Sequence, residues 1–130
     1  MEWKLNFRDD EILEIRSSGI FSNDDLKKMI EQIVSNPKWK KGMNSIVDFR
    51  DVEIKGLKLN DIYKTKDIHA HFSDMVGSGK IAAILNTDLG YGLSRSYEVI
   101  ANRHVKSRMM TFRDYDNGME WIQGGQNPGN

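Results

Sequence analysis

The sequence predicts an α/β fold, in which an N-terminal β-hairpin precedes alternating strands and helices that form a mostly parallel sheet of about five strands with four helices. Two short runs with β character, at residues 3–7 and 12–16, flank an acidic turn and predict the hairpin. Farther along, apolar β-branched runs alternate with segments of helical periodicity. The 130 residues have the length of one domain, expected at residues 1–123 with a flexible tail at residues 124–130.

The hairpin follows from an alternating pattern. Trp3, Leu5 and Phe7 alternate with polar residues, so their side chains share one face of the first strand. The second strand continues past Gly19, where we expect a bulge or a bend.

The clearest helix follows this hairpin. Ser22 suits its N-cap, Asp24 and Asp25 lie in the first turn, where carboxylates favour the helix dipole, and the Asn36–Pro37 step ends it. Its apolar residues share one helical face: Leu26, Met29, Ile30, Ile33 and Val34. An apolar run at residues 44–52 then predicts a buried strand.

The second long helical segment, at residues 56–79, has an apolar stripe that changes face. Its first part groups Leu59 with Ile62 and Tyr63, whereas its second part groups Ile68 with Phe72, Met75 and Val76. At about 100° per residue, Leu59 and Ile68 lie on opposite sides of a helix. Either the helix kinks between these parts, or one half presents its apolar groups away from the core.

The C-terminal part predicts a central strand at residues 79–87, a helix at 93–105, a strand at 106–114 and a short last helix capped by Asp114. The residues between 87 and 93 are expected to form a strand-to-helix loop whose glycines supply turn geometry. In the last helix we expect the core side to consist of Tyr115, Met119 and Ile122, with Trp121 at the flank.

Composition excludes several classes of partner. Lys and Arg balance Asp and Glu at 19 each, so no basic excess exists to drive nucleic-acid binding. The absence of cysteine excludes disulfides and thiolate metal sites and, with no apolar run typical of a secretory signal, makes a cytoplasmic location the expectation. His69 and His71 point to different sides of a helix, so neither a metal site nor a cofactor is predicted. The apolar runs are too short to span a bilayer, which limits membrane contact to a peripheral one.

Three stretches together, at residues 19–52, 80–101 and 109–122, resemble the SpoIIAA-like, or STAS-like, family of small bacterial domains, a largely uncharacterised branch. The resemblance lies in their order and spacing and covers nearly the whole chain. It implies a sheet of βα units with helices around it, and relatives among anti-sigma-factor antagonists and, more distantly, lipid-carrying CRAL-TRIO domains. The antagonists carry a regulatory phosphoserine in an Asp-Ser step, whereas here Asp88 precedes Leu89. Gly118 is a second departure, since these proteins tend to have alanine there.

The candidate ligand site lies beyond the carboxyl ends of the strands, where open α/β sheets bind ligands. We expect it between the strand end at residues 48–51, the loop at residues 88–95 and the segment at residues 57–76, interpreted as a mobile lid. Its candidate residues are Asp48, Arg50, Ile68, Phe72, Met75, Asp88, Tyr91, Gly92, Ser94 and Arg95. Backbone amides and Arg95 would hold a polar head group, and Tyr91 with the apolar residues of the lid would cover an apolar part.

Each of these features also has a purely structural interpretation. The glycines can serve a plain strand-to-helix connection, Asp48 and Arg50 can form a structural ion pair, and the segment at residues 57–76 can be a normally packed helix.

The sequence therefore favours a non-enzymatic binding or regulatory module for a small amphipathic or anionic ligand or lipid, which requires an apolar pocket of a few hundred Å³. The alternative is a protein–protein regulatory module of the anti-sigma-factor-antagonist type. It would use an exposed patch around Leu89, Tyr91 and Leu93, with phosphorylation of Ser94 or Ser96. An enzyme ranks third, because no cysteine nucleophile, GxSxG or HExxH motif is present. Self-association into a homo-oligomer is left open.

Overall fold

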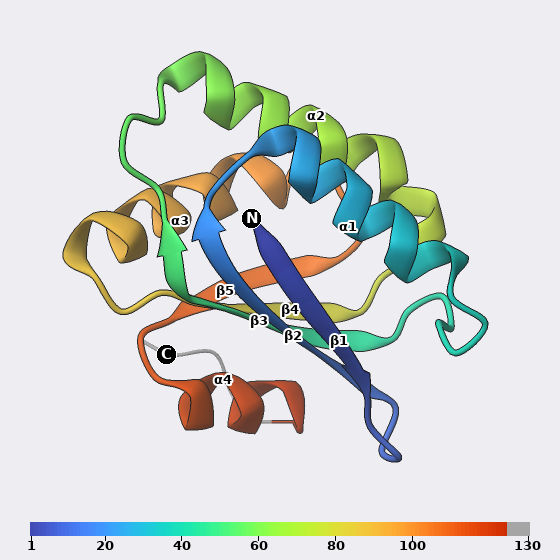
Figure 1. Cartoon of the computed structure of the whole chain (residues 1–130). Coiled ribbons are helices and arrows are strands. Elements are labelled where there is room, and N and C mark those ends of the chain that lie inside the picture. The colour runs from blue at the N-terminus through green and yellow to red at the C-terminus, as the bar shows by residue number, and fades with distance from the viewer. Residues whose placement is uncertain (125–130) are drawn as a thin grey trace.

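Five strands lie side by side in the order in which they occur along the chain (Figure 1). The computed structural model describes residues 1–124, so the predicted tail falls outside the described residues except for Gly124. The strands are β1 (Glu2–Phe7), β2 (Ile12–Ile20), β3 (Asn44–Glu53), β4 (Lys80–Ile84) and β5 (Arg108–Phe112). β1 pairs with β2 in antiparallel fashion, and the other three pairs are parallel. The predicted hairpin and the mostly parallel α/β sheet are confirmed.

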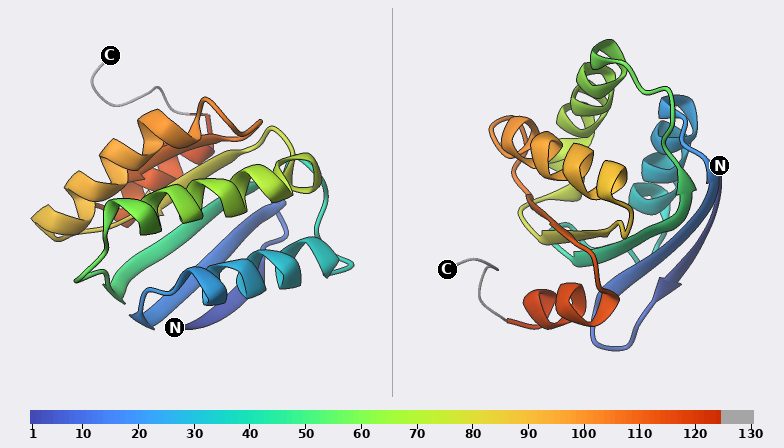
Figure 2. Two further views of the ribbon diagram at one scale, coloured as in Figure 1. Left: turned by 90° about the horizontal axis from the view of Figure 1, so that it is seen from above. Right: turned by 90° about the vertical axis from the view of Figure 1, so that its left-hand side faces the viewer.

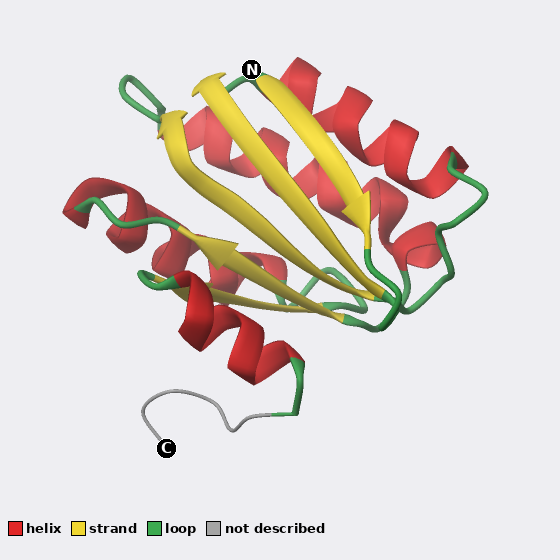
Figure 3. Ribbon diagram, turned by 60° about the horizontal axis from the view of Figure 1, so that its bottom comes forward, coloured by secondary structure: helices red, strands yellow, loops and turns green. Residues whose placement is uncertain are grey.

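The four helices divide unequally between the two faces of the sheet (Figures 1 and 2). They are α1 (Asn23–Ser35), α2 (Leu59–Val76), α3 (Asp88–Ala101) and α4 (Tyr115–Ile122). The first three each connect adjacent parallel strands, and because such crossovers share one hand, all three lie on the same face. Among the helices of residues 1–124, α4 alone covers the opposite face, where it follows the last strand and contacts β3, β4 and β5 (Figure 3).

Three helices on one face are more than a single layer can hold. Neighbouring strands are about 4.8 Å apart, whereas a helix with its side chains is about 10 Å wide. Successive crossovers would therefore bring the axes of adjacent helices too close together. The conflict is relieved by α2, which packs on α1 and α3 and stands farther from the sheet than either (Figure 2). Accordingly, Phe72 is the one residue of α2 that is fully buried.

The burial of α2 decides between the two alternatives for its apolar residues, a kink or a half that faces away from the core. The helix is uninterrupted from Leu59 to Val76, and Leu59 and Tyr63 near its start are exposed. One half of the helix therefore presents apolar groups away from the core, which is the second of the two alternatives. Within the described part of the chain, neither α2 nor any other helix is long and apolar enough to cross a bilayer.

Two apolar clusters hold the layers together. The cluster between the sheet and helices α1 and α2 consists of Leu13, Ile15, Leu26, Met29, Ile30, Ile33, Val47 and Phe72. The cluster beneath α4 consists of Ile12, Ile46, Ala82, Ile84, Phe112, Trp121 and Ile122. The expectation that Trp121 lies at the flank of α4 is wrong. Trp121 is 2% exposed, and its indole packs on Phe112 with the ring centroids 5.6 Å apart, because α4 turns this side chain toward the sheet.

Local signals fix the start of α1 and the irregularities of the neighbouring strand β2. Ser22 caps α1 as predicted, since its side chain accepts a hydrogen bond from the backbone N–H of Asp25 at 3.3 Å. The register of β2 against β3 shifts between Arg16 and Ser18, where β3 contains one residue more than β2, so this shift precedes Gly19. At Gly19 the backbone leaves the extended conformation, with a φ of 95° that glycine tolerates, so of the two expected irregularities the bend occurs there and the bulge does not.

The packing of Trp121 leads to a stability prediction. Trp121→Ala should lower the free energy of unfolding by about 3–5 kcal/mol, because it removes the largest fully buried side chain and leaves a cavity under α4. Urea denaturation followed by circular dichroism measures the change. Trp3→Ala, at a half-buried indole on the edge strand, is the control and should cost clearly less. Equal losses for the two variants would contradict the described position of α4.

Candidate functional site

A cavity of about 180 Å³ lies between the sheet and the three helices of one face. Its floor comes from β2, β3, β4 and β5, and its roof comes from α1, α2 and α3. Most of the side chains that line it are apolar, among them Leu13, Ile15, Met29, Val47, Ile81, Leu93 and Met109. Protein interiors contain few voids larger than a water molecule, so this cavity is a distinct feature of the core.

The helical period selects which residues of α2 and α3 reach the cavity. On α2 the lining residues are Ile62, Thr65, His69 and Val76, which follow one another at steps of three, four and seven. On α3 they are Gly90, Leu93, Ser94, Tyr97 and Glu98, again at steps of one helical turn. The faces of α2 and α3 that meet over the cavity therefore bring polar groups together.

These polar groups are hydrogen-bonded to one another. The hydroxyl of Tyr97 lies 2.5 Å from Nδ1 of His69, which joins α3 to α2. The hydroxyls of Ser94 and Thr111 are 2.6 Å apart and join α3 to β5. The carboxylate of Glu98 accepts a hydrogen bond of 2.8 Å from the backbone N–H of Thr111.

Burial keeps the His69–Tyr97 pair uncharged. It lowers the pKa of His69 from 6.5 to about 4, even though contact with the backbone of Thr65 acts in the opposite direction. It also raises the pKa of Tyr97 well above its ordinary value, with help from the negative charge of Asp67. Both side chains are therefore neutral at pH 7.

The stretch from Asp88 to Gly92 is helical, so the expectation of a loop there is wrong. Thr87 caps α3, because its Oγ1 accepts a hydrogen bond of 3.0 Å from the backbone N–H of Gly90. Gly90 is needed for close packing rather than for turn geometry, since a Cβ there would lie 2.8 Å from the Oγ1 of Thr87. At Gly92 nothing lies within 4 Å of such a Cβ.

Of the ten candidate ligand-binding residues, Ser94 alone lines the cavity. The other candidates on α3 lie toward its outer surface. Asp88 forms an ion pair with Arg113, whose guanidinium stacks 4.3 Å from the centre of the Tyr91 ring. Gly92 and Arg95 are exposed. On α2, Ile68 and Phe72 pack in the apolar cluster, and Met75 is exposed. The structure thus separates most of these residues from the cavity.

Asp48 and Arg50 belong to the opposite side of the sheet. Asp48 shares its face of β3 with Ile46, which packs under α4, because side chains alternate along a strand. Its carboxylate accepts two hydrogen bonds from the guanidinium of Arg50, at 2.9 and 2.8 Å, and one from the backbone N–H of Arg50 at 3.0 Å. The structure therefore does not bring this pair together with the cavity, although the expected ion pair is present.

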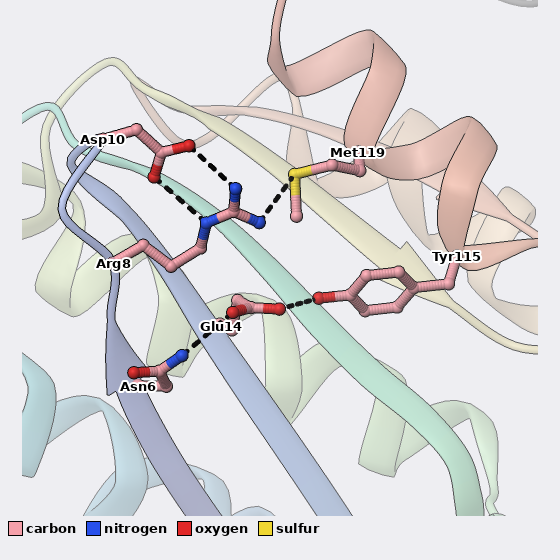
Figure 4. A network of polar contacts seen from close by, with 6 residues as sticks. All are labelled: Asn6, Arg8, Asp10, Glu14, Tyr115 and Met119. Carbon is pink, nitrogen blue, oxygen red and sulfur yellow. Dashed lines mark hydrogen bonds and ion pairs between the residues drawn. The ribbon is translucent and has the colours of Figure 1, made fainter.

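A polar network next to this ion pair ties α4 to the hairpin (Figure 4). Tyr115 donates a hydrogen bond to the carboxylate of Glu14, which also accepts one of 3.0 Å from Asn6. Arg8 pairs with Asp10 and contacts the sulfur of Met119 in α4. Burial and the charge of Glu14 raise the pKa of Tyr115. Because each of these groups is paired within the protein, this network has a structural role.

Sequence reasoning did not identify the His69–Tyr97 pair. It considered His69 only as a metal ligand beside His71 and did not connect it with Tyr97. The signal that was available is the one-turn spacing from Thr65 to His69 and from Ser94 to Tyr97, which repeats a polar group on a core-facing stripe.

The two glycines of α3 yield a matched pair of substitutions. Gly90→Ala should lower the free energy of unfolding by about 1–2 kcal/mol, because its methyl group displaces the capping side chain of Thr87. Gly92→Ala should raise it by about 0.5–1 kcal/mol, since alanine favours a helix and meets no neighbour. Thermal and urea denaturation of both variants measure the effects. A stabilising Gly90→Ala would contradict the described start of α3.

The Asp48–Arg50 pair predicts a pH dependence of stability. Arg50 holds the pKa of Asp48 below its ordinary value of 3.8, so the ionised carboxylate stabilises the folded protein. This contribution is complete above pH 3.8 and is lost as the pH falls through the lowered pKa. Wild type should exceed Asp48→Asn in free energy of unfolding by about 1–2 kcal/mol at pH 7. The difference should shrink on acidification below pH 3.8, and a difference that is constant down to low pH would refute this assignment.

Comparison with known proteins identifies the fold. Neither a protein-family model nor a curated protein matches this sequence. Among solved structures, the chain is similar to an uncharacterized protein of the DUF3478 family with a SpoIIAA-like fold from Shewanella loihica PV-4. The match has a TM-score of 0.60 and 14% sequence identity, and it covers 93% of this chain and 92% of that one. Together with the strand order and the helices on both faces, this likeness shows that the protein has the SpoIIAA-like fold predicted from its sequence.

Proposed function

We propose that this protein is a non-enzymatic binding module that takes a small amphipathic ligand into the cavity beneath α2. The observation that carries the proposal is the cavity itself, with apolar side chains over most of its wall and a few hydroxyl, imidazole and carboxylate groups between α2 and α3. Ligand sites in proteins commonly combine an apolar wall with a small number of polar groups that orient the ligand.

The size of the cavity limits the size of its ligand. An apolar cavity of about 150 Å³ is known to accept benzene, and drug-sized ligands occupy pockets of about 300–1,000 Å³. At about 180 Å³, this cavity is smaller than the few hundred Å³ expected from the sequence. It suits a single ring or a short chain, whereas a lipid with long acyl chains exceeds it. The proposed ligand is therefore a small molecule.

The energetic cost of an empty cavity supports the same proposal. Unfilled apolar volume is unfavourable, because the side chains that line it lack packing partners on one side. A ligand that fills the cavity supplies these contacts and stabilises the fold.

The two alternative functions have weaker support. Of the proposed contact patch for a protein partner, Leu89 is exposed, Tyr91 is half-buried under Arg113, and Leu93 faces the cavity. Of the two serines considered for phosphorylation, Ser96 is exposed and Ser94 is hydrogen-bonded to Thr111. The altered pKa values of His69 and Tyr97 arise mainly from burial, without the close charged partner typical of catalytic groups.

A titration with toluene tests the proposed function. Toluene should shift the methyl NMR signals of cavity residues and, at about ten times its Kd, should raise the free energy of unfolding by about 1.4 kcal/mol. Ala83→Met, which fills the cavity from the central strand β4, should abolish both effects. Val99→Met, which adds the same side chain on the exposed face of α3, is the control and should bind toluene normally. Absence of toluene binding to the wild-type protein would contradict the proposal.

A further inference from the structure

The His69–Tyr97 pair is the place where a ligand in the cavity can make hydrogen bonds. His69 comes from α2 and Tyr97 from α3, and both side chains line the cavity wall. Their mutual hydrogen bond links α2 to α3 over the cavity. The neighbouring hydroxyls of Ser94 and Thr111 already bond to each other, and Thr65 donates to Asn23 on α1.

The charge of the wall disfavours an anionic head group. Among the described residues that line the cavity there is no lysine or arginine, whereas the carboxylate of Glu98 is present. The carboxylate of Glu98 accepts a hydrogen bond from the backbone N–H of Thr111. Nε of Arg95, on the exposed side of α3, lies 3.9 Å from the same carboxylate. A carboxylate or phosphate in the cavity would lose its hydration without gaining a cationic partner, and it would be repelled by Glu98.

The hydrogen-bonding chemistry of the pair favours a hydroxyl. A neutral imidazole offers one donor and one acceptor nitrogen, and the protonated phenol of Tyr97 can both donate and accept. A ligand hydroxyl also donates and accepts, so it matches the pair in either tautomer of His69. An ether or a ketone can only accept, and therefore it leaves one partner unsatisfied when the histidine presents an acceptor.

We propose that the His69–Tyr97 pair binds the head group of the ligand, and that this ligand is a small neutral hydroxyl compound with an apolar skeleton, such as a monocyclic phenol or a short-chain alcohol. This assignment rests on the proposed function, because it names the ligand class of the same cavity. The ligand hydroxyl inserts between the two side chains, exchanging their mutual hydrogen bond for two bonds to the ligand. The apolar skeleton then lies over the sheet among residues such as Leu13, Val47 and Met109.

Three probes of similar shape test the ligand class by NMR titration of the wild-type protein at pH 7. These are p-cresol, which carries a neutral hydroxyl, toluene, which lacks it, and 4-methylbenzoate, which is an anion. We expect p-cresol to bind about tenfold more tightly than toluene, as a net hydrogen-bond contribution of about 1.4 kcal/mol implies. We expect 4-methylbenzoate to bind at least about tenfold more weakly than p-cresol.

A matched pair of tyrosine variants tests the residues. Tyr97→Phe should remove the preference for p-cresol over toluene while leaving the affinity for toluene within about twofold of wild type, which also verifies that the variant is folded. Tyr91→Phe makes the same change on the same helix outside the cavity and should keep the preference. Preference for p-cresol that survives Tyr97→Phe would overturn the assignment.

The outcomes separate this inference from the proposed function. Equal affinity of the wild-type protein for p-cresol and toluene, or tightest binding of 4-methylbenzoate, would overturn the hydroxyl assignment while cavity binding stands. If none of the three probes binds, the proposed function itself fails. The series on the wild-type protein gives this answer even if the Tyr97 variant does not fold.

Discussion

The mismatch between the spacing of strands and the width of a helix governs this structure. Because β2, β3, β4 and β5 are neighbours in sequence order, the helices that connect them must share one face over strands about 4.8 Å apart. A helix is about twice that width, so α1 and α3 take the places next to the sheet and α2 rests on them. The exposed Leu59 and Tyr63, the single fully buried residue of α2 and the cavity beneath it all follow from this arrangement.

A helix raised above the sheet must be held by contacts other than a broad apolar stripe. At its C-terminal end, Gly77 lies so close to Gly42 that a Cβ added to Gly77 would be 2.6 Å from the backbone nitrogen of Gly42. The N–H of Gly42 also donates a hydrogen bond of 2.9 Å to the carbonyl of Val76. Along its length, the hydroxyl of Thr65 and the ring of His69 reach α1 and α3 through hydrogen bonds. These polar contacts position α2 while leaving space below it.

The opposite face of the sheet is closely packed. There α4 closes a tightly packed cluster around Trp121 and Phe112, and Gly118 allows the helix to approach so closely that a Cβ would lie 2.7 Å from Cδ1 of Ile84. This close approach is a packing reason for glycine at position 118. The Glu14–Tyr115 hydrogen bond and the Asp48–Arg50 pair extend this face toward the hairpin. The protein thus combines one densely packed face with one that contains a cavity.

Periodicity was sufficient to predict the order of the elements and the caps at Ser22 and Asp114, because both depend on neighbours in sequence. It misassigned the start of α3, since Gly90 is selected by contact with Thr87 and Leu85 rather than by backbone freedom. The candidate site was predicted least well. Asp48 falls on the far face because of strand alternation, and the pairing of His69 with Tyr97 depends on how α2 is raised over the sheet. Spacing within one segment does not encode such contacts between helices.

The central claim is that α2 stands away from the sheet and leaves an apolar cavity that a small molecule can enter. A crystal structure of the protein pressurised with xenon tests it most directly, since xenon enters apolar cavities of this size. The account predicts xenon density between α2 and strands β3 and β4, with α2 packed on α1 and α3 as described. Absence of xenon there, with α2 settled onto the sheet and its side chains filling the space, would contradict the account.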